Sequence, residues 1–97
     1  LDTMWNDIDY LDRYEDFTAD PNYFADLKDF VSELHANDTH YIPILDIGIA
    51  ERASGYDAYS KGLDLGVYVS APNGDPFTGR VWPGDTVYPD FFAENTA

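Results

Sequence analysis

The sequence predicts an α/β fold in which a strand–helix–strand unit is followed by an excursion that carries a β-hairpin. Three observations support this prediction. Apolar runs occupy residues 1–8 and 40–49, and apolar residues recur at helical spacing between them. The connecting segment is long enough for the crossover that two parallel strands require. Residues 66–82 instead alternate apolar residues with a dense group of turn residues, which is typical of a hairpin.

The first predicted strand covers residues 1–8, with Met4 and Ile8 among its apolar positions. A helix-start signal comes at Asp20-Pro21, because aspartate suits the N-cap and proline suits the first helical position. The apolar residues that follow fall on one helical stripe: Phe24, Leu27, Phe30, Val31 and Leu34. This spacing predicts a helix of about four turns that ends near Asn37.

The second predicted strand runs from His40 to Ile49 and is almost continuously apolar, as expected of a strand covered on both faces in a parallel sheet. Pro43 counts against a fully central strand, because proline cannot donate to the ladder. Asp7 and Asp46 would each stand at the C-terminal end of a parallel strand. In a barrel, those ends meet at one mouth.

A long excursion follows the second strand. Residues 51–62 are polar and rich in tyrosine, which favours an irregular loop. Residues 66–70 alternate, residues 72–75 carry turn signals, and residues 77–82 form the returning strand of the predicted hairpin. A connection of this length usually has a function of its own. In a parallel barrel, the loops that follow the strands build the active site.

The predicted division is a βαβ portion at residues 1–52, an insertion at residues 53–90 and the start of a further helical segment at residues 91–97. A chain of 97 residues forms at most one small domain. It begins without an initiator methionine and stops as the last polar segment starts, so we expect a piece of a larger polypeptide.

The composition excludes several kinds of partner. The chain has 19 acidic and 5 basic residues and a net charge of −14, which argues against nucleic acid or an anionic membrane surface. A solvated surface accounts for most of these acids. No apolar run approaches the roughly 18 residues of a membrane span. The absence of cysteine excludes a disulfide scaffold and a thiolate metal site.

The stretch Trp5-Asn6-Asp7-Ile8-Asp9-Tyr10 places aromatic rings beside carboxylates. This suits sugar binding, because rings stack on a pyranose and carboxylates accept its hydroxyl protons. A surface turn with two buried rings explains the same composition. For Asp7 the alternative is a solvated acid at a strand end. For Asp46, which follows an apolar run, it is a carboxylate hydrogen-bonded to the backbone of the adjacent loop.

The sequence predicts no metal site and no cofactor. Asp7, Asp9 and Asp12 are closely spaced, but an EF-hand loop needs glycine at its sixth position and glutamate at its twelfth. Here those positions hold Asp12 and Thr18. Neither histidine has a second ligand at metal-binding spacing, and the chain lacks a phosphate-binding glycine loop and a nucleophile elbow. Separately, Asn37-Asp38-Thr39 matches the N-glycosylation acceptor pattern, in a polar stretch where a surface turn is expected.

Three segments, in this order and spacing, resemble glycoside hydrolase family 31, the retaining α-glucosidases that include the lysosomal acid α-glucosidase and intestinal maltases. They are residues 4–12 with 16–18, residues 41–46, and residues 79–84 with 88–91, and they contain Trp5-Asn6-Asp7, Ile44-Leu45-Asp46 and Val81-Trp82-Pro83-Gly84. The family's catalytic domain is an eight-stranded β/α barrel. The resemblance places the chain around the second and third strands of a TIM-type (β/α)8 barrel, with the excursion as the insertion after the third strand.

The resemblance also implies roles for single residues. Asp7 would accept hydrogen bonds from the outer hydroxyls of the terminal glucose. Ile8 and Ile44 would form an apolar wall, Trp82 an aromatic wall, and Asp46 would lie beneath the site and orient its neighbours. The family's nucleophile lies on the next strand and its acid/base further on, so no catalytic residue is expected in this chain. The partners would be an α-glucoside substrate and the remainder of the parent polypeptide.

Two details refine the resemblance. The family usually has proline directly after the aspartate of the second segment, whereas this chain has Ile47 after Asp46. The processing glucosidases of the endoplasmic reticulum resemble Trp-Leu-Asp-Ile-Glu-His in the first segment, so Trp5-Asn6-Asp7-Ile8-Asp9-Tyr10 favours the acid-glucosidase and maltase branch.

The expected function is therefore part of a retaining exo-α-glucosidase that hydrolyses terminal α-linked glucose from maltose-like oligosaccharides. The expected location is the secretory pathway, in a secreted, lysosomal or vacuolar protein. Two alternatives stay open at this point. One is a non-catalytic carbohydrate-binding or structural homologue of the same fold, and the other is an independent small acidic domain with an interaction role.

Overall fold

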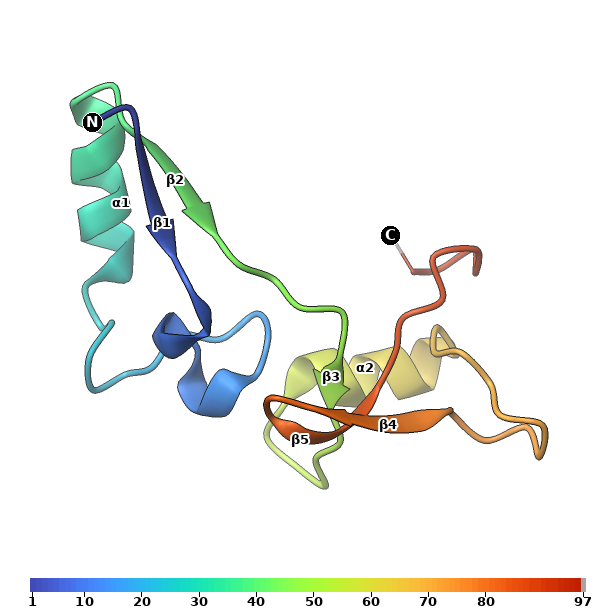
Figure 1. Ribbon diagram of the computed structural model, residues 1–97. Helices are drawn as coiled ribbons and strands as arrows, with labels where there is room; N and C mark the ends of the chain where they lie inside the picture. The colour runs from blue at the N-terminus through green and yellow to red at the C-terminus, as the bar shows by residue number, and fades with distance from the viewer. Residues whose placement is uncertain (97) are drawn as a thin grey trace. The chain divides into compact units, whose positions relative to one another are not determined.

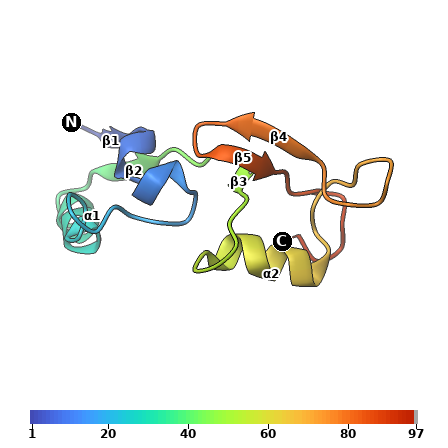
Figure 2. The ribbon, with the colours of Figure 1, turned by 90° about the horizontal axis from the view of Figure 1, so that it is seen from below.

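The computed structural model describes residues 1–96. They group into two compact units, Leu1–Leu45 and a second unit that begins at Asp46. Figure 1 and Figure 2 give two views of the ribbon. The first unit contains two parallel strands and one helix, and the second contains three antiparallel strands and one helix. The chain therefore combines helices and strands, and the predicted α/β class is confirmed. No helix within residues 1–96 is long and apolar enough to cross a membrane.

The first unit is a βαβ arrangement. Strand β1 (Thr3–Asn6) pairs in parallel with β2 (His40–Pro43), in a register that runs from Thr3 opposite His40 to Asn6 opposite Pro43. Helix α1 (Leu27–Ala36) is the crossover and packs against β2, as Figure 1 shows. Two short 3₁₀-helices, η1 (Ile8–Tyr10) and η2 (Asp12–Tyr14), follow β1. The predicted strand–helix–strand order is confirmed.

Helix α1 begins later than predicted. Asp20 does not cap it, because its carboxylate accepts the N–H of Asn22 at 2.7 Å and its carbonyl accepts the N–H of Phe24 at 2.8 Å. These bonds form a turn, a local alternative that aspartate offers the backbone. The helix starts at Leu27. Its predicted end near Asn37 is confirmed, since Asn37 is the C-cap.

The second predicted strand is wrong beyond Pro43. Its partner β1 ends at Asn6, and the last bond joins the Ile44 N–H to the Asn6 carbonyl at 3.0 Å. Continuous apolarity predicts burial, but a ladder also needs a neighbouring strand to pair with. The chain therefore leaves the parallel pair, and Ile49–Ala50 form β3 in the second unit.

The second unit is a three-stranded antiparallel sheet in the order β3-β5-β4. Strands β4 (Thr78–Val81) and β5 (Gly84–Val87) form a hairpin with Trp82 and Pro83 at its turn. The predicted returning strand at 77–82 is thus confirmed as β4, but its ladder partner is β5. Residues 66–70 contribute only isolated bridges, among them Ser70 to Pro76.

The irregular loop predicted for residues 51–62 is confirmed over residues 51–56 and is wrong from Asp57, where helix α2 (Asp57–Leu65) begins. Asp57 and Lys61 form an ion pair at 2.8 Å, four residues apart. Such a pair stabilises a helix, and the prediction from the polar, tyrosine-rich composition did not take it into account. Gly66 then ends the helix in the left-handed conformation, with φ 65°. One side of the helix packs on a buried cluster: Ile49, Ala50, Tyr56, Val67, Tyr68 and Val87.

The predicted division into residues 1–52, 53–90 and 91–97 stays a prediction. The two compact units instead meet in the chain between Leu45 and Asp46. Residues 91–95 form turns and a bend. The helical segment predicted for 91–97 also includes Ala97, which lies outside the described residues.

Candidate functional site

The first unit brings the ends of two parallel strands together at one edge. Asp7 and Ile8 follow β1, and Ile44 follows β2. The bond from the Ile44 N–H to the Asn6 carbonyl, at 3.0 Å, holds the two ends side by side. Parallel strands present their C-terminal ends on the same side, the side on which β/α enzymes place their sites. Three of the predicted binding residues therefore share one edge.

Asp7 is exposed and begins the 3₁₀-helix η1. Its Oδ1 accepts the N–H of Ile8 at 2.8 Å, from an extended backbone with φ −84° and ψ −175°. This bond satisfies a backbone donor at the start of η1. A carboxylate offers about four acceptor positions, so it retains acceptor capacity toward solvent or a ligand. The geometry suits both a strand-end acid and a sugar acceptor.

Tyr10 lies in the stretch that the sequence analysis singled out, but no role of its own was predicted for it. Its side chain is 6% exposed, and its hydroxyl donates to the Ile44 carbonyl at 2.8 Å. Its ring meets Phe24 edge to face, with centroids 6.4 Å apart. Burial, helped by Tyr41 and Asp16, raises the pKa of Tyr10, so the phenol stays protonated. The alternative interpretation, a surface turn with two buried rings, is confirmed for Tyr10 and wrong for Trp5, which is 59% exposed.

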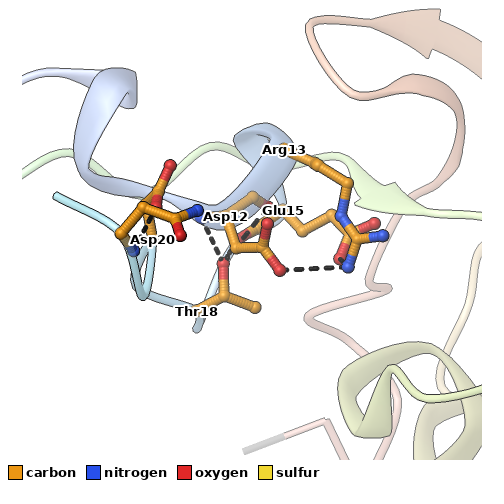
Figure 3. Close-up of polar contacts among 6 residues, drawn as sticks. Asp12, Arg13, Glu15, Thr18 and Asp20 are labelled. Atoms are coloured by element: carbon orange, nitrogen blue, oxygen red, sulfur yellow. Dashed lines mark hydrogen bonds and ion pairs between the residues drawn. The ribbon is translucent and has the colours of Figure 1, made fainter. Parts of the chain in front are cut away.

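A tight loop follows Tyr10 (Figure 3). The Thr18 hydroxyl accepts the N–H of Asp12 at 3.0 Å and donates to the Glu15 carbonyl at 2.5 Å. Arg13 forms an ion pair with Asp12 at 3.0 Å and lies 3.9 Å from Glu15. Burial raises the pKa of Glu15. The positive charge of Arg13 acts to lower this pKa, and the negative charge of Asp12 acts to raise it further.

This loop gives the segment at residues 16–18 a structural meaning. Asp16 is fully buried, Thr18 closes the turn, and Phe17 has a φ of 64°. Arg13 and Tyr14 also have positive φ, which costs roughly 1 kcal/mol or more at each non-glycine residue.

Within residues 1–96, no three His, Asp or Glu side chains are grouped so that they could hold a metal ion.

Asp46 and Trp82 belong to the second unit. Asp46 follows Ile44 and Leu45 and is half-buried. It was predicted at the end of a parallel strand, but β2 has already ended at Pro43. Trp82 is 69% exposed at the turn of the β4–β5 hairpin.

The residues around Trp82 account for its presentation. Gly84 has a φ of 109°, which favours glycine after a two-residue turn. Arg80 pairs with Asp85 across the hairpin at 3.0 Å. Gly79 lies against the ring of Tyr88, where a Cβ would collide. These features stabilise the hairpin whose turn carries the exposed indole of Trp82.

Asn37 lies on the surface, as its acceptor pattern predicted. Its Nδ2 donates to the Glu33 carbonyl at 2.8 Å and so helps to end α1. Thr39 is buried, and its hydroxyl donates to the Leu1 carbonyl at 3.2 Å. Asp38 between them has a φ of 54°.

Comparison with known proteins gives one consistent result. The family model of the glycosyl hydrolases family 31 TIM-barrel domain matches residues 1–97. Mouse lysosomal alpha-glucosidase is 45% identical over 93 residues, covering 94% of this chain and 10% of that protein. Glucoamylase 1 of Candida albicans is 41% identical over 104 residues, covering 99% of this chain and 11% of that protein.

The fold gives the same answer. A crystal structure of glucosidase II alpha subunit matches with a TM-score of 0.91 at 27% identity, over 98% of this chain and 10% of that one. The chain thus spans about a tenth of the length of the curated relatives that it matches. On the family model, on these relatives and on this fold, the chain belongs to glycoside hydrolase family 31, as part of its TIM-barrel domain.

Proposed function

We propose that the polypeptide containing this chain is a retaining exo-α-glucosidase, and that the chain contributes part of the wall that binds the terminal glucose. The observation that carries the proposal is the exposed Asp7 at the C-terminal edge of a parallel strand pair, directly after Asn6, whose carbonyl accepts the N–H of Ile44. Relatives named lysosomal alpha-glucosidase and glucoamylase support it. The strands would be the second and third of the barrel, and residues 53–90 an insertion after the third.

In this proposal each residue has a distinct task. Asp7 accepts hydrogen bonds from the outer hydroxyls of the glucose, and Ile8 and Ile44 cover its apolar face. Trp82 supplies an aromatic wall from the hairpin, and Asp46 orients groups beneath the sugar. Few convergent acceptors on an apolar wall are typical of a small-ligand pocket. The nucleophile and the acid/base come from other parts of the polypeptide.

The polypeptide would pass through the secretory pathway. The support is the acceptor pattern at Asn37 on an exposed helix end and the lysosomal name of relatives. We therefore propose Asn37 as an N-glycosylation site.

The test is replacement of Asp7 by alanine in the parent polypeptide, with maltose as substrate. Loss of charge-assisted hydrogen bonds to the sugar should lower kcat/KM by about 100-fold. Asp2→Ala is the matched control, because it removes another exposed carboxylate, just before the other end of β1. It should leave kcat/KM unchanged.

Two results would count against the proposal. Equal kinetics for Asp7→Ala and the wild type would remove Asp7 from the sugar site. A wild-type polypeptide that binds maltose without hydrolysing it would be the non-catalytic homologue instead. Isothermal titration beside the hydrolysis assay separates these two results.

A further inference from the structure

The backbone of Ile44 bonds to one residue before Asp7 and to one residue after it. Its N–H donates to the carbonyl of Asn6 at 3.0 Å, and its carbonyl accepts the hydroxyl of Tyr10 at 2.8 Å. Asn6 directly precedes Asp7, and Tyr10 ends the short helix that Asp7 begins. The Asp7–Ile8 segment is therefore bracketed by two bonds to one residue.

The Asn6 bond continues the ladder that any parallel pair would form. The Tyr10 bond is different, because it is a side-chain bond between positions 34 residues apart. It joins the segment after β1 to the segment after β2. It ties Ile44 to the far end of η1.

Tyr10 is itself held firmly. Its N–H donates to the Asp7 carbonyl at 3.3 Å, and its carbonyl accepts the N–H of Asp20 at 2.8 Å. Its ring packs against Phe24, and burial keeps the phenol protonated by raising its pKa. A donor fixed at the backbone, ring and hydroxyl gives its acceptor a defined position.

We infer that Tyr10 is a positioning residue for sugar recognition: its hydroxyl bond to the Ile44 carbonyl sets the distance between the Asp7 acceptor and the Ile44 wall. This rests on the proposed function, in which those two residues touch the terminal glucose. The consequence concerns selectivity. A glucose hydroxyl reaches Asp7 only if the apolar wall holds the ring at the matching distance.

The experiment is Tyr10→Phe in the full polypeptide, which deletes the hydroxyl and keeps the ring that packs on Phe24. The substrates are p-nitrophenyl α-glucoside and its 4-deoxy and 6-deoxy analogues, which lack the hydroxyls farthest from the scissile bond. The ratio of kcat/KM for the glucoside to kcat/KM for each analogue measures recognition of one hydroxyl. For at least one analogue, Tyr10→Phe should lower this ratio about fivefold, the usual value of one hydrogen bond.

Tyr68→Phe is the matched control. Tyr68 is 7% exposed, and its hydroxyl donates to the Ala58 carbonyl at 2.8 Å. It is therefore a tyrosine of similar burial that makes a bond of the same length, within the second unit. This variant should lose thermal stability and keep the wild-type ratios.

Phe24→Leu is a second variant, which removes the ring that packs on Tyr10 and leaves the Tyr10 hydroxyl in place. Because this packing helps to hold the hydroxyl, its ratios should change in the same direction as those of Tyr10→Phe, by less than fivefold. A Tyr10→Phe enzyme with unchanged ratios, or one that fails to fold, would show a purely structural role and overturn the inference. Failure of the proposed function looks different, because the wild type itself would then not hydrolyse the glucoside.

Discussion

The two units bury different kinds of side chain. The second unit encloses an apolar cluster whose members come from β3, β5, the loop before α2 and the segment after it. The first unit buries Tyr10 and Leu11 together with the polar residues Glu15, Asp16 and Thr39. Among the described residues of β1, β2 and α1, none is buried.

The difference follows from how the strands pair. Three antiparallel strands and one helix can cover one face of a sheet within a short stretch of chain. A parallel pair needs cover on both faces, and here Trp5 and Ile42 are 59% and 53% exposed. Within the described residues, the unit that carries Asp7 thus buries few apolar side chains, and polar bonds join its strand ends.

Excising the two units tests this contrast most directly. A peptide of residues 46–97 should show a cooperative thermal transition by circular dichroism, because its apolar cluster is internal. A peptide of residues 1–45 should show none, since too little apolar surface is buried to offset chain entropy. A cooperative melt of the 1–45 peptide would contradict the contrast between the two units.

Overpacking the second unit should cause the next largest effect. Gly62 lies against the Tyr68 ring, and a Cβ at this position would overlap it. Gly62→Ala should lower the free energy of unfolding of the 46–97 peptide by about 2 kcal/mol, measured by urea denaturation. Ser60→Ala on an exposed position of the same helix is the control. Equal midpoints for both variants would show that this core is loosely packed.

The pH dependence of the first unit should be the smallest effect. Burial raises the pKa of Glu15 above its ordinary 4.5, so the folded state favours the protonated acid. The stability that this group contributes is complete below about pH 4.5 and is lost as pH rises through the raised pKa. Glu15→Gln should therefore flatten the fall in Tm of the parent polypeptide between about pH 4 and pH 7.

The exposed Glu33 on α1 provides the control for this titration. Glu33→Gln should retain the wild-type pH dependence of Tm. A Glu15→Gln variant that follows the wild-type curve would mean that Glu15 titrates normally.

Much of the architecture could be predicted because its signals are local. The helical stripe, the apolar runs and the turn residues before β4 depend on neighbours in the chain, and β1, α1, β2 and β4 lie within the predicted segments. The ordered segments around Trp5, Ile44 and Trp82 also predicted the family that the comparisons show. Asp7 at the end of β1 followed from the same local pattern.

Other features were decided only by the tertiary structure. Strand β2 ends at Pro43, opposite Asn6, the last residue of β1. Pro43 counted against a central strand, but only the length of its partner β1 shows where the pairing stops. Asp20 uses its carboxylate in a turn instead of a helix cap. Tyr10 lies in a polar stretch, and only a bond to Ile44, 34 residues away, makes it a buried donor. Local spacing determines which elements can form, whereas the pairing of distant backbone groups determines where they end and which polar residues become fixed.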